Sequence, residues 1–229
     1  MRRLIAVSLG AILGAGFFPP IPAQAVTCGE ETLFAISADF PAYGTKAEVY
    51  LKDRNLENSC SSPNAWSTVH LRPDTGYTRW VEIGWFEDKD SNGNKRWRLF
   101  YETQLGGLKE YANILLNCCK WIALRLQNID GGNYWKFYYD SDANGGWTLI
   151  GPSGGIDTGF HKGYPYSETG RRGDPGTGAV DHFRELTFKD DRALYNWSHW
   201  TDAHQFGVNY ITGYEYVDIS HDEYQVSAV

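Results

Sequence analysis

Short stretches of alternating polar and apolar residues, separated by turn-forming residues, constrain the fold of this chain more than any other feature. The clearest turn is Asn92-Gly93, which lies between the stretches 77–86 and 97–103. Asn-Gly favours a tight β-hairpin because both residues tolerate the positive φ angles that such a turn needs. Two further turns lie at residues 130–133 and 142–146, and the stretches beside them are 120–128, 134–140 and 147–150. These hairpins predict antiparallel β-structure.

The rest of the chain extends this all-β pattern. Few windows keep a helical period, and aromatic residues make up 15% of the sequence. Further strands are predicted at residues 46–53, 66–71, 183–189, 206–210 and 214–219. Residues 104–114 and 151–182 are rich in glycine and are predicted to be irregular loops. About ten strands predict two packed antiparallel sheets, a β-sandwich of the jelly-roll or concanavalin-like kind, formed as a single domain by residues 26–229.

The first 25 residues are predicted to be a secretory signal peptide. Arg2 and Arg3 precede an apolar stretch at residues 4–18, and Ala23-Gln24-Ala25 matches a cleavage site. The apolar stretch is short for a membrane-spanning helix, so an uncleaved anchor is the less favoured alternative. We therefore expect a secreted, extracellular protein that does not insert into a membrane.

The charge of the chain argues against polyanionic partners. The net charge is −7, and it would be −9 without Arg2 and Arg3. An acidic surface repels phosphate backbones and anionic membranes, so no nucleic acid partner is expected. We expect a monomer that carries no cofactor.

Four cysteines, Cys28, Cys60, Cys118 and Cys119, suit an exported protein with disulfides. Four cysteines allow three connectivities. A bridge between neighbouring residues is strained, so we expect Cys118 and Cys119 each to reach back to Cys28 or Cys60.

Period-two alternation assigns the two faces of the predicted strands. In residues 79–86, Val81, Ile83 and Trp85 form an apolar face that belongs between the sheets. The outward residues of residues 79–86 and 120–126 are Trp80, Glu82, Gly84, Phe86, Trp121, Ala123 and Arg125. Aromatic residues on an outer face indicate a contact surface, or alternatively a second packing layer beneath residues 151–182.

Two glutamates are candidates for catalysis. Glu82 lies in mid-strand between Trp80, whose apolar ring would raise the pKa of a carboxyl, and Gly84, which leaves room for a ligand to approach. Glu168 shares a face with Tyr166 if this segment is extended, and arginines follow it at 171 and 172. The alternative for Glu82 is a solvated strand residue, and for Glu168 a loop residue paired with one of those arginines.

The sequence around Glu82 resembles the neprosin family of glutamic peptidases. The most specific motif is Glu82-Ile-Gly-Trp85 with Arg98-Leu-Phe-Tyr101, joined by a Gly/Asp/Asn turn. Residues 44–50, the Gly-Asn-Tyr-Trp motif at residues 132–135 and the His-Phe pair at residues 182–183 follow the family's order, so the resemblance covers about residues 44–190.

This resemblance implies a β-sandwich with a catalytic glutamate pair, Glu82 and Glu168, in the groove of one sheet. Such a pair shares a proton and hydrolyses peptide bonds with an activated water at acidic pH. A peptide or polymer substrate would lie in the groove. The residues expected to bind it are Trp80, Trp121, Arg125, Tyr138 and Tyr166.

Two other functions fit the same pattern. A non-catalytic, lectin-like module could bind a carbohydrate or another polymer through its aromatic face. A jelly-roll glycoside hydrolase would instead use two carboxyls about 5–9 Å apart. Opposed side chains of Glu82 and Glu168 favour an enzyme over a binding module.

Two acidic turns, at residues 88–94 and 140–146, fit the first half of a calcium loop. Both lack the bidentate glutamate that closes such a loop, because Leu99 and Gly151 stand in its place. We favour ordinary Asx and glycine turns, and we expect no metal site, although His199, His204 and His221 are of metal-binding types.

Overall fold

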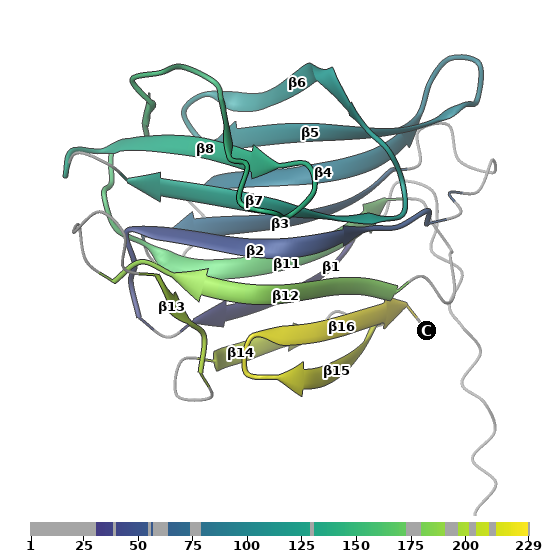
Figure 1. The fold of residues 1–229 in the computed structure, drawn as a ribbon. Coiled ribbons are helices and arrows are strands. Elements are labelled where there is room, and N and C mark those ends of the chain that lie inside the picture. The colour runs from purple at the N-terminus through teal and green to yellow at the C-terminus, as the bar shows by residue number, and fades with distance from the viewer. Residues whose placement is uncertain are drawn as a thin grey trace, which may run out of the picture.

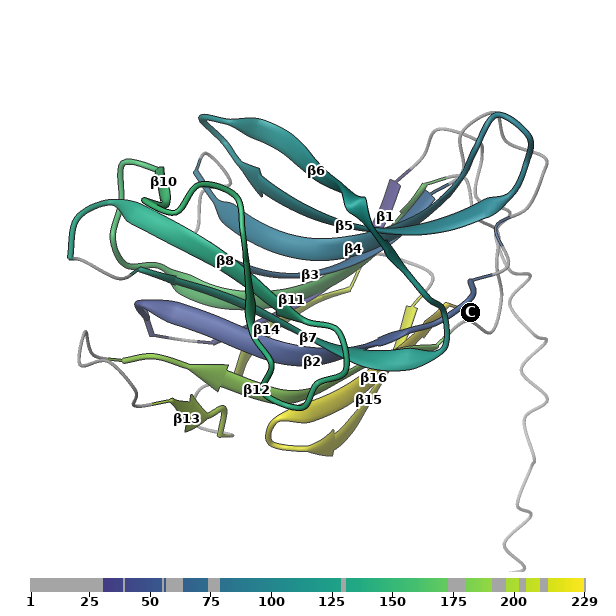
Figure 2. The same cartoon turned by 45° about the horizontal axis from the view of Figure 1, so that its top comes forward.

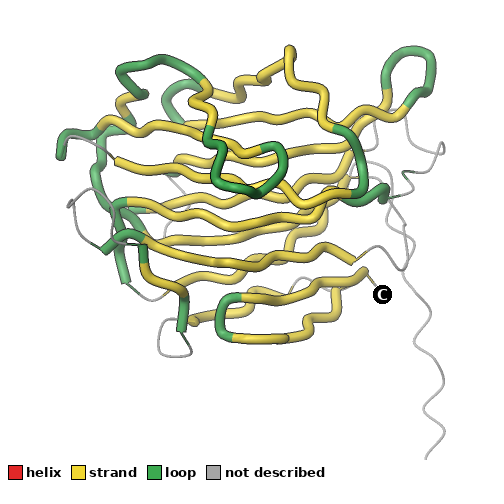
Figure 3. Tube along the Cα trace, viewed as in Figure 1, coloured by secondary structure: helices red, strands yellow, loops and turns green. Residues whose placement is uncertain are grey.

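The chain forms two antiparallel β-sheets packed face to face, which confirms the predicted β-sandwich. A computed structural model describes residues 31–38, 40–54, 56, 64–73, 79–128, 131–172, 180–190, 197–201, 205–210 and 214–228. These residues contain strands, turns and loops and no helix (Figure 3). Accordingly, none of the described segments is a helix that could cross a membrane. The predicted signal peptide, Cys28 and Cys60 lie outside the described residues.

One sheet has seven strands, and β3 is its central strand (Figure 1). In spatial order the strands are β14 (Gln205–Tyr210), β1 (Glu31–Ala38), β11 (Tyr164–Arg172), β3 (Asn64–Arg72), β4 (Val81–Lys89), β5 (Lys95–Thr103) and β6 (Gly107–Leu116). Strands β11 and β4 therefore flank β3 although they lie far apart in the sequence.

The other sheet has nine strands. Its order is β10 (Ile156–Asp157), β8 (Tyr134–Asp140), β7 (Lys120–Asn128), β2 (Gly44–Leu51), β12 (Val180–Phe188), β16 (Glu223–Ala228) and β15 (Tyr214–Ser220), while β9 (Thr148–Ile150) pairs with β8 and β13 (Ser198–His199) with β12. Figure 2 shows the two sheets as layers, with β8, β7 and β2 across from β6, β5 and β4.

The space between the sheets is filled by the apolar faces that alternation predicted. Val81, Ile83 and Trp85 of β4 are fully buried. Across the layer, β7 contributes Ile122, Leu124 and Leu126, and β8 contributes Trp135 and Phe137. Removing this apolar surface from water is the main stabilising contribution to the fold. The opposite faces of both sheets are left to hold polar and aromatic residues.

The prediction of two irregular loops is wrong in part, because each segment contains a long strand. Residues 107–116 form edge strand β6, and residues 164–172 form β11, which lies inside the seven-stranded sheet. In both segments the loop prediction rests on their glycine content. In β11, backbone pairing on both sides with β1 and β3 offsets the weak strand propensity of Pro165 and Gly170.

The expected disulfide pairing of Cys118 and Cys119 is also wrong, since these neighbours are bonded to each other. They lie between β6 and β7, where Cys119 adopts a positive φ of 72°. This left-handed conformation, together with the hydrogen bond from the Cys119 backbone N–H to the Leu51 carbonyl (2.8 Å), fixes the turn.

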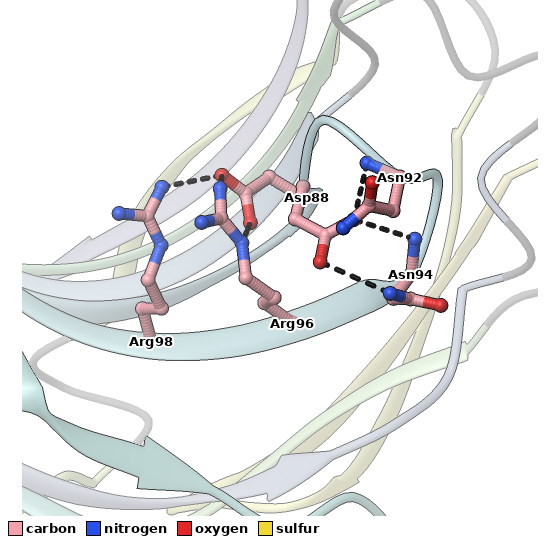
Figure 4. Close-up of polar contacts among 6 residues, drawn as sticks. Asp88, Asn92, Asn94, Arg96 and Arg98 are labelled. Atoms are coloured by element: carbon pink, nitrogen blue, oxygen red, sulfur yellow. Dashed lines mark hydrogen bonds and ion pairs between the residues drawn. The ribbon is translucent and has the colours of Figure 1, made fainter.

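The acidic turn at residues 88–94 is held by its own hydrogen bonds (Figure 4). The carboxylate of Asp90 accepts the backbone N–H groups of Asn92 (2.8 Å) and Asn94 (2.9 Å). Asp88 pairs with Arg96 (2.7 Å) and with Arg98. The carboxylates are thus already satisfied by turn and cation partners, as expected of an Asx turn.

Candidate active site

The register of β3 brings Glu82 and Glu168 onto one face of the seven-stranded sheet. His70 lies opposite Glu82 on β4 and opposite Tyr166 on β11. Two residues earlier, Thr68 lies opposite Glu168. Because cross-strand partners share a face, and because residues two apart in a strand also do, Glu82 and Glu168 point away from the core on the same side.

The two carboxyls are close enough to influence each other. They lie on strands separated by β3 and are offset by two residues, so their Cα atoms are about 12 Å apart. The pKa of Glu82 is raised well above its usual value, first by burial and second by the negative charge of Glu168. Glu82 therefore retains its proton at pH values at which an exposed glutamate has lost it.

Glu168 has a different environment, which contains hydrogen-bond donors. It is buried, with 8% of its surface exposed. Arg72 lies 3.4 Å from one carboxylate oxygen, and the indole N–H of Trp66 lies 3.4 Å from the other. The Arg72 guanidinium also stacks over the ring of Tyr166 at 4.7 Å. Donors on both oxygens stabilise the ionised carboxylate.

A third carboxyl, Glu102 of β5, lies directly opposite Glu82. The two side chains are hydrogen-bonded, and the bond raises the pKa of Glu82 while it lowers that of Glu102. Burial nevertheless holds the pKa of Glu102 above its usual value. Glu82 is thus the donor in this bond and Glu102 the acceptor, and the pair shares one proton.

His70 separates Glu82 from Tyr166 and is neutral. Burial, followed by the positive charge of Arg72, lowers the pKa of His70 well below its usual value. Its ring stacks on Tyr166 with centroids 4.9 Å apart, and its Nδ1 lies 3.4 Å from the Thr68 hydroxyl. A neutral imidazole beside Glu82 adds no cation that would favour ionisation of that carboxyl.

Gly84 does not leave room for a ligand, contrary to the sequence-based expectation. A Cβ atom at this position would lie 2.5 Å from the Thr68 methyl, 2.6 Å from the Ser67 carbonyl oxygen and 2.7 Å from the Phe100 ring. The space is filled by neighbouring strands. Gly84 is needed so that β3, β4 and β5 can approach one another beside Glu82.

The residues predicted to bind substrate divide between the two sheets. Tyr166 lies beside His70, and half-buried Trp80 immediately precedes β4, two residues before Glu82. Trp121 and Arg125 of β7 and Tyr138 of β8 instead lie on the outer face of the nine-stranded sheet. The core separates the two outer faces, so these three residues do not join Glu82 and Glu168 in one site.

Four residues of the site were not predicted: Trp66, His70, Arg72 and Glu102. The position of Glu102 could have been predicted from the hairpin. A hairpin centred on residue 92 pairs residues whose numbers sum to 184, so Glu102 lies opposite Glu82. For β3, period two places the side chains of residues 66, 68, 70 and 72 on one face. Nothing in the sequence shows that this strand lies between β4 and β11.

A possible ligand set for a metal lies elsewhere. Glu185, His199 and Asp222 each offer one ligand atom, and these atoms lie within 4.8 Å of one another. Among the described residues this is the one such group, and it lies on β12, β13 and the turn between β15 and β16. His199 Nδ1 is 2.6 Å from Asp222, so an ordinary ion pair accounts for the contact.

Comparison with solved structures identifies glutamic peptidases as neighbours in fold. A scytalido-glutamic peptidase with a transition state analog inhibitor has a TM-score of 0.53 at 14% identity, covering 89% of this chain and 100% of that chain. Another structure of scytalido-glutamic peptidase, with a peptide based transition state analog, has a TM-score of 0.51 at 11% identity and the same coverage.

Sequence comparisons identify no relative. No protein family model matches the chain, and no curated protein matches it. The structural neighbours therefore show that this chain has the β-sandwich fold that glutamic peptidases use. The resemblance to the neprosin family stays a prediction.

Proposed function

We propose that this protein is a secreted glutamic endopeptidase that cleaves peptide bonds at acidic pH with Glu82 and Glu168. The observation that carries the proposal is the placement of both carboxyls on one face of the seven-stranded sheet, with Glu168 raising the pKa of Glu82. Two carboxyls whose charges influence each other in different surroundings are the requirement for acid–base hydrolysis.

The environments of the two glutamates suggest their roles. Glu168, which accepts from Arg72 and Trp66, is suited to be the ionised general base that takes a proton from water. Glu82, whose pKa is raised by burial, is suited to donate its proton to the carbonyl oxygen of the scissile bond. In the resting protein Glu102 holds this proton by accepting a hydrogen bond, and a substrate carbonyl would take the place of Glu102.

The proposed reaction balances without a covalent intermediate. Water attacks the carbonyl carbon while its proton moves to Glu168 and the Glu82 proton moves to the carbonyl oxygen. The tetrahedral diol then collapses as the C–N bond breaks. The leaving amine takes the proton from Glu168, and a diol hydroxyl returns a proton to Glu82, so both carboxyls recover their starting states.

The fold comparison supports the proposal, since two structural neighbours with TM-scores above 0.5 are glutamic peptidases. Export by the predicted signal peptide would carry the enzyme to surroundings that can be acidic. The half-buried rings of Trp80 and Tyr166 would contact substrate side chains on either side of Glu82. An apolar substrate residue such as proline would pack favourably against these two rings.

The test is digestion of casein and of a fluorogenic peptide library at pH 3–6. We expect the wild-type protein to cleave, and E82Q and E168Q each to lose about 10²–10⁴-fold in kcat, the usual contribution of general acid–base catalysis. The matched control is E185Q, which removes an exposed carboxyl from the other sheet and should retain full activity. Absence of cleavage by the wild-type protein, or equal activity of E82Q, would contradict the proposal.

A further inference from the structure

Two cations lie side by side on the outer face of the nine-stranded sheet. Arg125 of β7 is the direct cross-strand partner of Lys46 of β2, and on its other side Arg125 lies opposite Tyr138 of β8. The three residues form one row across neighbouring strands, on the side of the sheet that faces away from the core. None of them contributes to the function proposed above.

The Arg125 guanidinium is held between two aromatic rings. Tyr138 and Trp147 each have their ring centroid 4.2 Å from its central carbon. Its Nε is buried and has no hydrogen-bond acceptor. Within the described part of the chain, Arg125 has no carboxylate partner. Stacking on the two rings, and not an ion pair, thus fixes the orientation of the guanidinium.

Lys46 adds a second charge at the same place. Its ammonium lies 5.3 Å from the ring centroid of Trp197. Burial, followed by the positive charge of Arg125, lowers the pKa of Lys46. The charges of Glu185 and Glu48 offset this in part, although Glu48 pairs with Arg184 at 2.7 Å and Glu185 lies 3.8 Å from His199. Two adjacent, partly buried cations repel each other, and a bound anion would relieve this repulsion.

The surroundings of the two cations limit the kind of anion. Trp147, Tyr138 and Trp197 are all partly exposed, so flat apolar surfaces flank the charges. Such rings pack well against the C–H face of a pyranose sugar. The net charge of the chain is −7, which disfavours a long polyanion such as nucleic acid but not a short ligand with few charges.

We propose that this face binds an acidic saccharide, whose carboxylate is held by Arg125 and Lys46 while its sugar rings pack on Trp147 and Trp197. The planar fork of arginine matches the two oxygens of a carboxylate, and the lysine supplies a further charge-assisted hydrogen bond. Because Arg125 and Glu82 lie on opposite sides of the sandwich, the saccharide would bind without covering the glutamates. The surface would attach the protein to an acidic polysaccharide while its other face remains open.

Isothermal titration calorimetry with trigalacturonate tests this proposal, with cellotriose as the neutral control. We expect trigalacturonate to bind in a 1:1 ratio and cellotriose to bind at least tenfold more weakly. R125Q and K46Q should each weaken binding about tenfold, a typical effect of losing one charge-assisted contact. The control K109Q removes an exposed cation from the other sheet and should bind as the wild type does.

Two further measurements keep the test independent of the folding of any variant and of the proposed peptidase activity. Wild-type affinity should fall as NaCl is raised, because the contact is ionic. E82Q should bind trigalacturonate as the wild-type protein does. The proposal is overturned if trigalacturonate does not bind, if R125Q binds it equally well, or if sulfate alone binds as tightly as the saccharide.

Discussion

The outer faces of the two sheets are built from similar residues but bury opposite charges. On the seven-stranded sheet, Glu82, Glu168 and Glu102 lie together among aromatic rings. On the nine-stranded sheet, Arg125 and Lys46 lie together among aromatic rings. Burial moves the pKa of Glu82 upward and that of Lys46 downward, in each case toward the neutral form.

The two faces differ in how they compensate for the unfavourable free energy of burying a charged group. The carboxyls can share protons with one another, so Glu82 and Glu102 form a hydrogen-bonded pair. An arginine stays protonated in proteins, so Arg125 is stabilised by stacking and, in the proposed complex, by the carboxylate of the saccharide. A cluster of buried acids is therefore suited to move protons, whereas a cluster of buried cations is suited to hold a ligand.

One buried ion pair connects the two sheets, so breaking it should have the largest effect. Arg54 is fully buried and joins the sheets, since it pairs with Asp181 of β12, stacks on Trp85 at 4.3 Å and donates to the Trp66 carbonyl at 3.0 Å. We expect R54M to lose about 3–5 kcal/mol of unfolding free energy, because Asp181 stays buried without its cation. Urea unfolding measures this, and the control is R79Q, which removes an arginine whose hydrogen bond to the Gly159 carbonyl is exposed.

A change confined to the carboxyl face should have the next largest effect. We expect G84A to lose about 1–3 kcal/mol, because its methyl group would overlap Thr68 and Phe100. Thermal unfolding measures the loss. A G84A protein as stable as the wild type would contradict the close packing of β3, β4 and β5 around Gly84.

The cation of the carboxyl face influences the pH at which Glu82 loses its proton. Arg72 lies beside Glu168 and lowers the pKa of Glu82. R72Q should therefore move the pH–activity profile to higher pH and reduce kcat about tenfold, because a hydrogen bond to a charged group is lost. A profile at the wild-type position would show that Arg72 acts only as a structural residue.

The smallest effect concerns stability against pH. The pKa of Glu82 is higher in the folded protein than in the unfolded chain, where it is about 4.3. The contribution of Glu82 to the free energy of unfolding is therefore fully present below about pH 4.3 and is lost as the pH rises through the folded pKa. We expect the stability of E82Q relative to the wild-type protein to increase from pH 4 to pH 8. His70 acts in the opposite sense, but it is common to both proteins and cancels in the difference. Chemical denaturation at each pH provides the measurement, and a pH-independent difference would contradict the raised pKa.

Alternation along single strands was enough to predict the sandwich, its core and the outward position of Glu82. Pairing between distant strands was not predictable in this way. Residues 164–172 contain proline and glycine and therefore resemble a loop, yet two neighbouring strands hold them as β11. The same limit explains Trp121, Arg125 and Tyr138: alternation shows that a residue faces outward but not which sheet it belongs to.

The coupling of Glu82 to Glu168 is tested most directly by titrating the side-chain carboxyl carbon of Glu82 by NMR in the wild-type protein and in E168Q. Glu82 should titrate well above the ordinary value of about 4.3 in the wild-type protein. In E168Q its pKa should fall but stay raised, because burial is the larger cause and remains. An unchanged titration of Glu82 in E168Q would show that the two carboxyls do not form a pair.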